Sequence, residues 1–281
     1  MISYLNAFRH WFTFRVYYYL PFCRPASLRI HGKIDFDLYS FLAISGKSRV
    51  SLGAGLILQK SRLYMDNATC SLGPNSIVRQ SILVIRDSQF ETGMSAKLIQ
   101  KEVHCVNQST FRAGDFVQLS GVGSSGSFFM NASFAEWGTN VNVFAKVQCN
   151  QSHFSIGDHV FINEGTEVRC HNTIKMGSYI MVSYDCRLFD TNTHSTKAEW
   201  RRREINDGFP NSTIQQDSVK AQIKTAPIII GDDVWIGTRA ILFRGTKLAD
   251  QVIVGAASVV AGLDVPVGKK VVGNPGKIMD H

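Results

Sequence analysis

The 281-residue chain lacks several features that mark common protein classes. Its six cysteines have neither CxxC pairing nor zinc-ligand spacing, and no cleavable signal peptide precedes them. The formal net charge is +8, yet Lys and Arg are scattered and no continuous basic helix is present. We therefore expect reduced, mostly buried thiols, a cytoplasmic protein and no nucleic-acid partner, with phosphate groups of a small cofactor sufficient to account for the positive charge.

An aliphatic residue recurs every six positions in the C-terminal part of the chain. The repeated residues are Ile230, Ile236, Leu242, Leu248, Val254 and Val260, and small or β-branched residues stand four places after the first five, at Val234, Ala240, Thr246, Val252 and Ser258. This period fits neither an α-helix nor a long strand, so the chain must turn a corner after each short strand. Three such hexads then make one triangular turn, which predicts a left-handed parallel β-helix of the all-β class.

The same repeat predicts which residues stack. Residues three hexads apart, such as Ile230 and Leu248, should lie one above the other inside the coil. Gly231, Gly237 and Gly255 should occupy tight corners, because glycine has no Cβ to clash there. Toward the N-terminus the pattern loosens, with turns expected to open near Leu52, Leu72, Phe90, Phe111, Phe134, Ile156, Met176, Ile230 and Leu248. We therefore expect about nine turns in one elongated domain, residues 31–279.

Two segments interrupt the repeat. Residues 1–30 interleave aromatic side chains with arginines and are too polar and too short to span a bilayer. They predict either a helix that caps the open end of the solenoid or an interfacial helix that makes peripheral contact with the inner face of a membrane. The second interruption, 191–227, is rich in charge and predicts an excursion loop expelled from the wall.

A histidine lies at the start of this excursion. His194 follows the sequence Asp190-Thr191-Asn192-Thr193. An imidazole with an ordinary pKa near 6.5 can take a proton from an alcohol at neutral pH. Asp190 or a backbone carbonyl is the expected group that fixes its tautomer.

Several motifs resemble those of a known family. The segments Val234-Trp235-Ile236-Gly237, Gly255–Val260, Asp264-Val265-Pro266 and Gly273–Lys277 look like the C-terminal half of hexapeptide-repeat acyltransferases. The branch they resemble contains maltose, galactoside and nodulation-factor O-acetyltransferases and bacterial surface-glycan O-acetyltransferases. The resemblance implies a homotrimer that transfers acetyl from acetyl-CoA to a sugar hydroxyl, with active sites between adjacent prisms and with a surface polysaccharide or its precursor as acceptor.

The resemblance also implies roles for individual residues. His194 matches the family's general base and Asn163 its acceptor-binding asparagine. Thr238 and Ala256 match backbone positions that meet the pantetheine arm of acetyl-CoA. Trp235 would flank the cleft or pack between subunits, and Lys277 would meet cofactor phosphates, with Lys269 and Lys270 nearby.

Two departures from the family pattern concern the cofactor. Ala261-Gly262-Leu263-Asp264 lacks an expected Thr-Lys, which removes one phosphate contact, and Phe243-Arg244 replaces an aliphatic-proline pair, so Arg244 is a candidate for the lost charge. Aromatic residues around Phe128, Phe134 and Trp137 could fill the core or extend an acceptor groove.

Two other functions compete with the transferase. One is a β-helix scaffold without activity. The other is a zinc-dependent solenoid of the carbonic-anhydrase kind, which needs three converging imidazoles. His153 and His171, three hexads apart, are candidates to stack on one face, with His159 on the next, but no third histidine in convincing register accompanies them. We therefore expect no metal.

Overall fold

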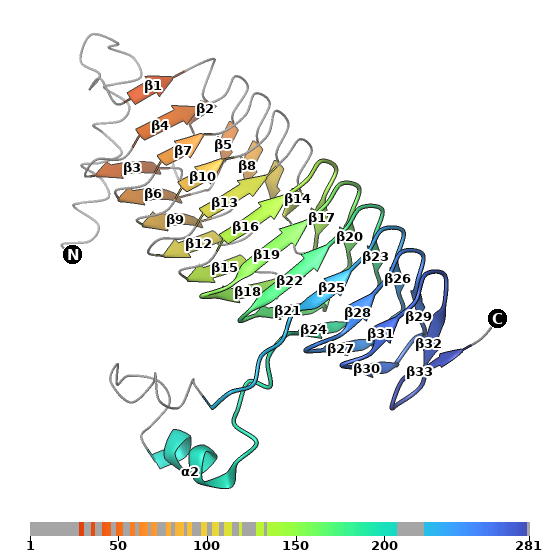
Figure 1. Ribbon diagram of the computed structural model, residues 1–281. Helices are drawn as coiled ribbons and strands as arrows, with labels where there is room; N and C mark the ends of the chain where they lie inside the picture. Colours follow the sequence, from red (N-terminus) through yellow and green to blue (C-terminus); the bar gives the residue numbers. More distant parts are fainter. Residues whose placement is uncertain are drawn as a thin grey trace.

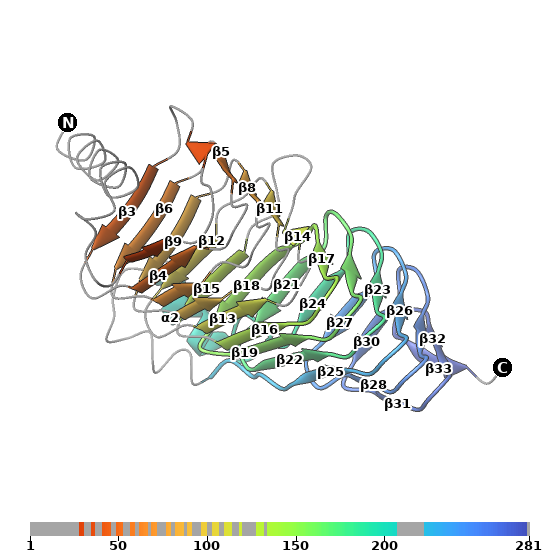
Figure 2. The same ribbon diagram turned by 90° about the horizontal axis from the view of Figure 1, so that it is seen from above.

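The structure is a computed structural model that describes residues 135–206 and 222–279 in full and, before residue 135, the backbone of the strands from Leu28 onward. Three parallel sheets wind around a common axis to form an elongated triangular prism (Figures 1 and 2). The parallel β-helix predicted from the hexad repeat is confirmed. The cap or interfacial helix predicted for residues 1–30 lies outside the described residues, apart from the strand Leu28–Ile30.

Each turn contributes one strand to each sheet. The first sheet contains β1 (Leu28–Ile30), β4 (Arg49–Leu52), β7 (Thr69–Ser71), β10 (Gln89–Glu91), β13 (Thr110–Ala113), β16 (Phe134–Trp137), β19 (His153–Ile156), β22 (Thr173–Met176), β25 (Ile228–Ile230), β28 (Lys247–Leu248) and β31 (Asp264–Val265). The second contains β2 (Asp35–Phe36), β5 (Ile57–Gln59), β8 (Ile77–Arg79), β11 (Lys97–Ile99), β14 (Gln118–Leu119), β17 (Asn142–Val143), β20 (Phe161–Ile162), β23 (Met181–Val182), β26 (Trp235–Ile236), β29 (Ile253–Val254), β32 (Lys270–Val272) and the antiparallel β33 (Lys277–Met279).

The third sheet contains β3 (Phe41–Ser45), β6 (Arg62–Asp66), β9 (Ile82–Arg86), β12 (Val103–Val106), β15 (Phe128–Asn131), β18 (Lys146–Asn150), β21 (Glu167–Cys170), β24 (Arg187–Phe189), β27 (Ile241–Phe243) and β30 (Val259–Ala261). The prism therefore has three edges. We call the edge between the first and second sheets corner one, that between the second and third sheets corner two, and that between the third sheet and the next turn corner three.

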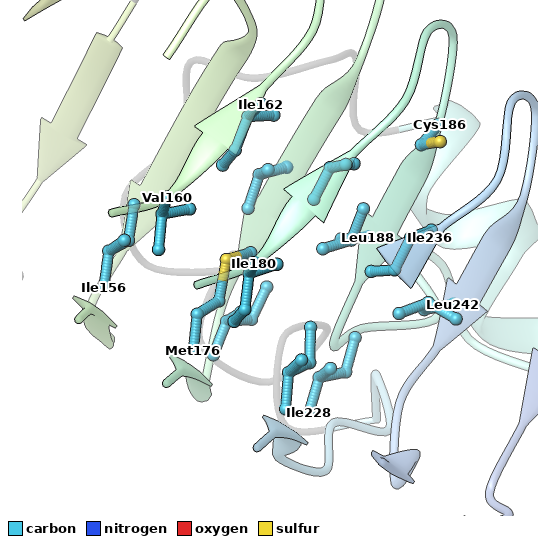
Figure 3. Packing of buried hydrophobic residues seen from close by; sticks show 14 of the residues in the cluster. Ile156, Val160, Ile162, Met176, Ile180, Cys186, Leu188, Ile228, Ile236 and Leu242 are labelled. Carbon is cyan, nitrogen blue, oxygen red and sulfur yellow. The ribbon is translucent and has the colours of Figure 1, made fainter. Parts of the chain in front are cut away.

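The predicted stacking is confirmed by strand register. Ile230 pairs with Leu248 and Leu242 pairs with Val260, each three hexads further along the chain. All eleven residues of the hexad pattern are buried, including the polar Thr246 and Ser258. Figure 3 shows how such side chains meet inside the coil, with those from one turn resting on those of the next.

The number of turns was underestimated from the sequence. The nine predicted openings coincide with first-sheet strands from β4 to β28, but the described strands of that sheet also include β1 and β31. In β31 only Val265 is buried, and the pairing of Lys247 with Asp264 shows that this turn is one residue shorter than three hexads. A strand this short, followed by no further hexad, gives almost no periodic signal.

The cores of neighbouring turns are filled as expected. Cys149, Cys170 and Cys186 are free and buried, which agrees with the prediction of buried thiols for the three cysteines whose side chains are described. Trp137 is buried and packs edge-on against Phe154, with ring centroids 6.2 Å apart. Of the two roles predicted for the aromatic region, Trp137 therefore has the core-filling one.

Corner one carries a ladder of side-chain acceptors. The backbone N–H of Thr139 donates to Asp158 Oδ1 (2.6 Å), and Asp158 N–H donates to Ser178 Oγ (3.0 Å). Ser178 N–H then donates to Asp232 Oδ1 (2.7 Å), and Asp232 N–H to Asp250 Oδ1 (2.8 Å). Each turn thus provides an acceptor for a backbone N–H group at corner one of the turn before it. Buried backbone N–H groups require such a partner.

The same ladder explains the glycines that precede it. A Cβ on Gly231 would meet the Asp250 carboxylate and would lie 2.8 Å from the Asp250 backbone nitrogen. A Cβ added to Gly138, Gly157 or Gly177 would likewise clash with the next turn. The glycine is needed because two turns approach closely, as the sequence predicted for Gly231.

We predict that Gly231→Ala lowers the free energy of unfolding by about 1–3 kcal/mol, because the added methyl group forces two turns apart. Thermal and urea denaturation measure this. The matched control is Ala249→Gly, at the equivalent position one turn on, which should change stability by less than about 1 kcal/mol. Equal stability of Gly231→Ala and the wild type would show that the corner is looser than the geometry indicates.

Candidate functional site

The excursion leaves the prism at corner three. β22 and β25 are adjacent in the first sheet although Ile174 pairs with Ile228, so the intervening chain includes β23, β24 and the excursion. Figure 1 shows the excursion leaving between β24 and β25 and carrying the helix α2 (Ala198–Asn206) away from the wall. The described parts of the excursion, 191–206 and 222–227, lie between these two strands, and the predicted loop bounds 191–227 stay a prediction.

The two arms of the excursion are joined at their root. Thr191 and Thr225 form an antiparallel bridge. Asn192 N–H donates to Lys224 O (3.0 Å), and Ala226 N–H donates to Asp190 O (3.0 Å). The root is therefore fixed to the rigid wall.

Asp190 anchors this root through the turn before it. Its two carboxylate oxygens accept the backbone N–H groups of His171 (2.7 Å) and Asn172 (2.8 Å). The side chain is fully buried, and burial raises the pKa of the Asp190 carboxyl, opposed by those two hydrogen bonds. Both oxygens of this carboxylate are thus engaged by the wall.

Glu204 is the partner of the histidine. His194 Nδ1 lies 2.9 Å from Glu204 Oε2, with the His194 side chain 50% exposed and the Glu204 side chain only 10% exposed. Asp190, one of the two groups predicted to fix the His194 tautomer, is therefore not the group that contacts Nδ1. An ionised carboxylate can only accept, so the contact with Glu204 assigns the proton to Nδ1 and, in the neutral ring, leaves the lone pair on Nε2. The contact with Glu204 thus fixes the orientation of a half-exposed imidazole.

Local contacts fix the start of helix α2. Ser195 Oγ accepts the N–H of Lys197 (3.2 Å) just before the helix, and Arg201 Nη1 donates back to Ser195 O (2.9 Å). Glu199 in the first turn and Arg203 in the last suit the helix dipole, although none of the helix residues is buried. The sequence offered no signal for Glu204, because its contact with His194 depends on how α2 folds back on the root.

Arg244 holds the other side of the root. Its Nε donates to Asn192 Oδ1 (2.7 Å), two residues before His194. Thr193 between them has a left-handed φ of 62°, and its N–H donates to Thr191 Oγ1 (3.0 Å). We predicted Arg244 as a substitute phosphate ligand, but the structure places it as a support for the histidine segment.

The other candidate residues lie along corner two. The backbone N–H groups of Asn163 and Ser183 donate to the turn that follows each (2.9 Å in both cases), so Asn163, Ser183 and Gly237 form one column. Beside this column Ala257 N–H donates to Thr238 O (2.8 Å), which confirms that the turns of Thr238 and Ala256 are adjacent.

Corner two is closely packed where Gly237 meets the turn of Ala256. A Cβ on Gly237 would lie 2.7 Å from Ala256 N. Thr238 is partly exposed and Ala256 is exposed, so an extended chain could approach their backbone. Asn163 is partly exposed, and its amide group can both donate and accept hydrogen bonds.

Trp235 lies on the outer face of the second sheet, next to corner two. Its side chain is 49% exposed, and its Nε1 donates to Ser183 Oγ (3.2 Å). It stands in register with Met181, itself in register with Phe161, and both are exposed. We call Phe161, Met181 and Trp235 the apolar band.

Lys277 belongs to the same edge, whereas its predicted neighbours do not. Lys277 begins β33 opposite Val272, and the adjacent Gly276 N–H donates to Val259 O (2.7 Å) at the start of β30. Lys270 stands at the other end of β32, opposite Met279, with Lys269 just before it. Lys269 and Lys270 therefore approach corner one instead.

The structure thus divides the predicted site between two edges of the prism. Asn163, Trp235, Thr238, Ala256 and Lys277 lie at or beside corner two, and His194 lies at corner three. The third sheet separates the edges, so one copy does not bring His194 to the other five.

The predicted histidine stack is absent. His153 pairs with Thr173 rather than with His171, because this turn is two residues longer than three hexads. His159 stacks instead on Tyr179, with ring centroids 4.8 Å apart. Within residues 135–206 and 222–279 no three His, Cys, Asp or Glu side chains are grouped to hold a metal ion. Over the same residues, no helix has the length and apolarity required to cross a membrane.

The comparisons with known proteins identify short stretches of similarity. No family model matches the chain. The 2,3,4,5-tetrahydropyridine-2,6-dicarboxylate N-acetyltransferase of Clostridium perfringens is 47% identical over 53 residues, which is 19% of this chain and 22% of that protein. The protein of that name from Staphylococcus aureus is 41% identical over 54 residues, with the same two coverages, 19% and 22%. The chain therefore spans about a fifth of the length of these curated relatives.

Three solved structures are also similar. A hexapeptide-repeat-containing acetyltransferase from Vibrio cholerae has 28% identity and a TM-score of 0.36, over 45% of this chain and 61% of that chain. A maltose O-acetyltransferase from Clostridium difficile has 24% identity and a TM-score of 0.33, over 45% and 57%. A polySia-specific acetyltransferase has 18% identity and a TM-score of 0.42, over 91% and 81%.

The chain resembles hexapeptide-repeat acetyltransferases. The resemblance drawn from its motifs is confirmed, and its physical basis is the triangular coil with its buried hexads.

We predict that His194 carries its proton on Nδ1 and that Glu204→Ala moves it to Nε2, the tautomer that an unconstrained neutral imidazole favours. Nitrogen NMR of histidine-labelled protein above pH 8 reports the two tautomers. Glu199→Ala, on the same helix, is the control and should leave the His194 signals unchanged. The same tautomer in wild type and Glu204→Ala would remove Glu204 from the site.

Proposed function

We propose that this protein transfers an acetyl group from acetyl-CoA to a sugar hydroxyl, in a bacterial surface polysaccharide or its precursor. The observation that carries the proposal is the His194–Glu204 pair, a base with an assigned tautomer on an excursion anchored to the wall. An alcohol is a weak nucleophile until its proton is removed, and a positioned imidazole does this at neutral pH.

In this mechanism His194 Nε2 accepts the hydroxyl proton while the oxygen attacks the thioester carbonyl carbon. Glu204 stabilises the positive charge that then develops on the imidazole. As the carbon–sulfur bond breaks, the imidazolium returns the proton to the leaving sulfur, which gives free thiol and the acetyl ester. No covalent enzyme intermediate is needed, and the pair is restored after each cycle.

The corner-two residues suit the cosubstrate. Thr238 and Ala256 present backbone on adjacent turns where side chains are small, so they can hold the extended pantetheine arm. Trp235 would flank this groove, and Lys277 would meet phosphate as a point charge. Asn163, on an earlier turn of the same edge, would bind the acceptor hydroxyl.

The separation of these residues from His194 supports a homotrimer. In a ring of three prisms, corner three of one copy can face corner two of the next, which completes three equivalent sites. The exposed apolar band lies beside corner two, where such a contact would cover it. The site is then built by two copies, with His194 from one and Trp235, Thr238 and Ala256 from its neighbour.

We place this reaction in the cytoplasm, where acetyl-CoA is available and the buried free thiols stay reduced. The working domain is residues 31–279, and residues 1–30 are proposed to cap it or to rest on the inner face of the membrane.

A second acceptor class is an amine, favoured by the N-acetyltransferase names of the curated relatives. An unprotonated amine is nucleophilic without a base, so the two classes differ in how strongly they depend on His194.

We predict that His194→Ala lowers kcat for acetyl transfer to a sugar hydroxyl by about 100- to 10,000-fold, the range for loss of a general base. Thiol release from acetyl-CoA against a panel of glycans and amino sugars measures this. The control His159→Ala removes an imidazole at corner one and should retain full activity. Undiminished transfer by His194→Ala would exclude His194 as the base, and the absence of thiol release with every acceptor would favour an inactive scaffold.

We also predict that two inactive variants complement each other. When His194→Ala and Trp235→Ala chains are co-expressed in equal amounts, random mixing leaves about a quarter of the sites with an intact His194 facing an intact Trp235. Activity should therefore recover to roughly that fraction of the wild type. If each site belonged to a single chain, no site would be intact and the mixture would stay inactive.

A further inference from the structure

The residue before His194 has a strained backbone. Thr193 has a left-handed φ of 62°, and among the non-glycine residues with left-handed φ in the described part of the chain it is the only β-branched one. A branched Cβ is crowded by the backbone in this conformation, so such a residue persists only where its surroundings hold it there. The strain therefore lies directly beside the base of the proposed reaction.

Hydrogen bonds to one carbonyl hold this turn. Thr193 Oγ1 donates to Asn192 O (2.6 Å), and His194 N–H donates to the same oxygen (2.7 Å). Thr193 N–H donates in turn to Thr191 Oγ1 (3.0 Å). The position of His194 thus depends on where Asn192 is held.

The wall holds Asn192 through Arg244. Arg244 lies at corner three of the turn that follows the excursion, is half-buried, and donates from Nε to Asn192 Oδ1 (2.7 Å). The next residue, Gly245, donates its N–H to Pro227 O (3.0 Å) on the returning arm. Residues 244 and 245 therefore connect one turn of the rigid coil to both arms of the excursion.

The contact with Glu204 needs a support of this kind. The side chain of His194 is half exposed, and none of the residues of α2 is buried. Burial in the core therefore holds neither His194 nor the helix that carries its partner. A hydrogen bond between two such side chains orients the ring only if the backbone behind it is already fixed.

We infer that Arg244 and Asn192 are positioning residues that fix the backbone of His194, with the strained turn at Thr193 as the element they hold. The inference rests on the proposed acetyl transfer, because it assigns how the base of that reaction is placed. Neither side chain touches the reacting atoms. A displacement of a catalytic group by about 1 Å can cost roughly 100-fold in rate, so the loss should fall on kcat and not on cosubstrate binding.

A pair of variants tests whether the two residues act together. Arg244→Met and Asn192→Ala should each lower kcat for acetyl transfer by about 10- to 100-fold and leave the KM for acetyl-CoA unchanged. Because both remove one contact, the double variant should be no slower than the slower single variant. Asn192→Asp keeps an acceptor for Arg244 and should retain most of the activity. Lys247→Met, which removes an exposed cation from the first sheet, is the matched control and should have wild-type kcat.

The strained turn gives a second test. Thr193→Gly releases the strain, so the melting temperature should stay within about 2 °C of the wild type, while kcat falls about 3- to 10-fold because the backbone beside His194 can rotate. The matched control is Gln251→Gly, at a corner-one residue that also has a φ of 62°, and it should leave kcat unchanged. Wild-type kcat in Thr193→Gly would overturn the role of the turn.

Nitrogen NMR of the histidine backbone amides provides a readout without activity. The His194 amide signal should shift or broaden in Arg244→Met and in Asn192→Ala, and it should stay unchanged in Lys247→Met. An unchanged His194 amide in both variants would overturn the inference. Wild-type kcat in both, or losses that add in the double variant, would overturn it and still support the acetyl transfer. No thiol release from the wild type with any acceptor would overturn the proposed function and the catalytic part of the inference, and the amide signals would then decide whether Arg244 fixes the backbone of His194.

Discussion

Stacking of each turn on the next is the constraint on which the rest of this structure depends. Backbone N–H groups of one turn donate to carbonyls of the following turn along all three sheets, and at corner one side-chain acceptors continue the pattern. A residue is therefore positioned by the turns above and below it rather than by its neighbours in sequence. This is why hexads with little in common beyond one aliphatic residue and one small residue build the same shape.

The sequence predicted this part well because stacking leaves a direct trace in it. Interior positions such as Ile236 and Val254 must be aliphatic, and close corners such as Gly231 must be glycine, so the period of six appears in the residues themselves. The signal weakens where turns vary in length. The predicted register of His153 with His171 assumed a turn of three hexads. This turn is longer, so the two histidines do not pair and the predicted stack does not form.

The site was predictable in part for the same reason. Thr238 and Ala256 follow the regular repeat, so their adjacency could be deduced from spacing. Glu204, Arg244 and Asp190 could not be assigned, since their roles depend on the path of a non-repeating loop. Asp190 illustrates the difficulty: a carboxylate four residues from the histidine looked like its partner, yet the backbone of the preceding turn holds it.

The position of His194 on an excursion separates the requirements of stability from those of the proposed chemistry. On the wall, inward side chains are buried and outward ones share a face with the side chains of the next turn, so a wall residue has little freedom to be oriented by a dedicated partner. The excursion escapes this restriction because its root is closed by the Thr191–Thr225 bridge and by Arg244, while α2 folds back to supply Glu204. The rigid coil thus fixes where the histidine segment starts, and the loop alone decides how the imidazole points.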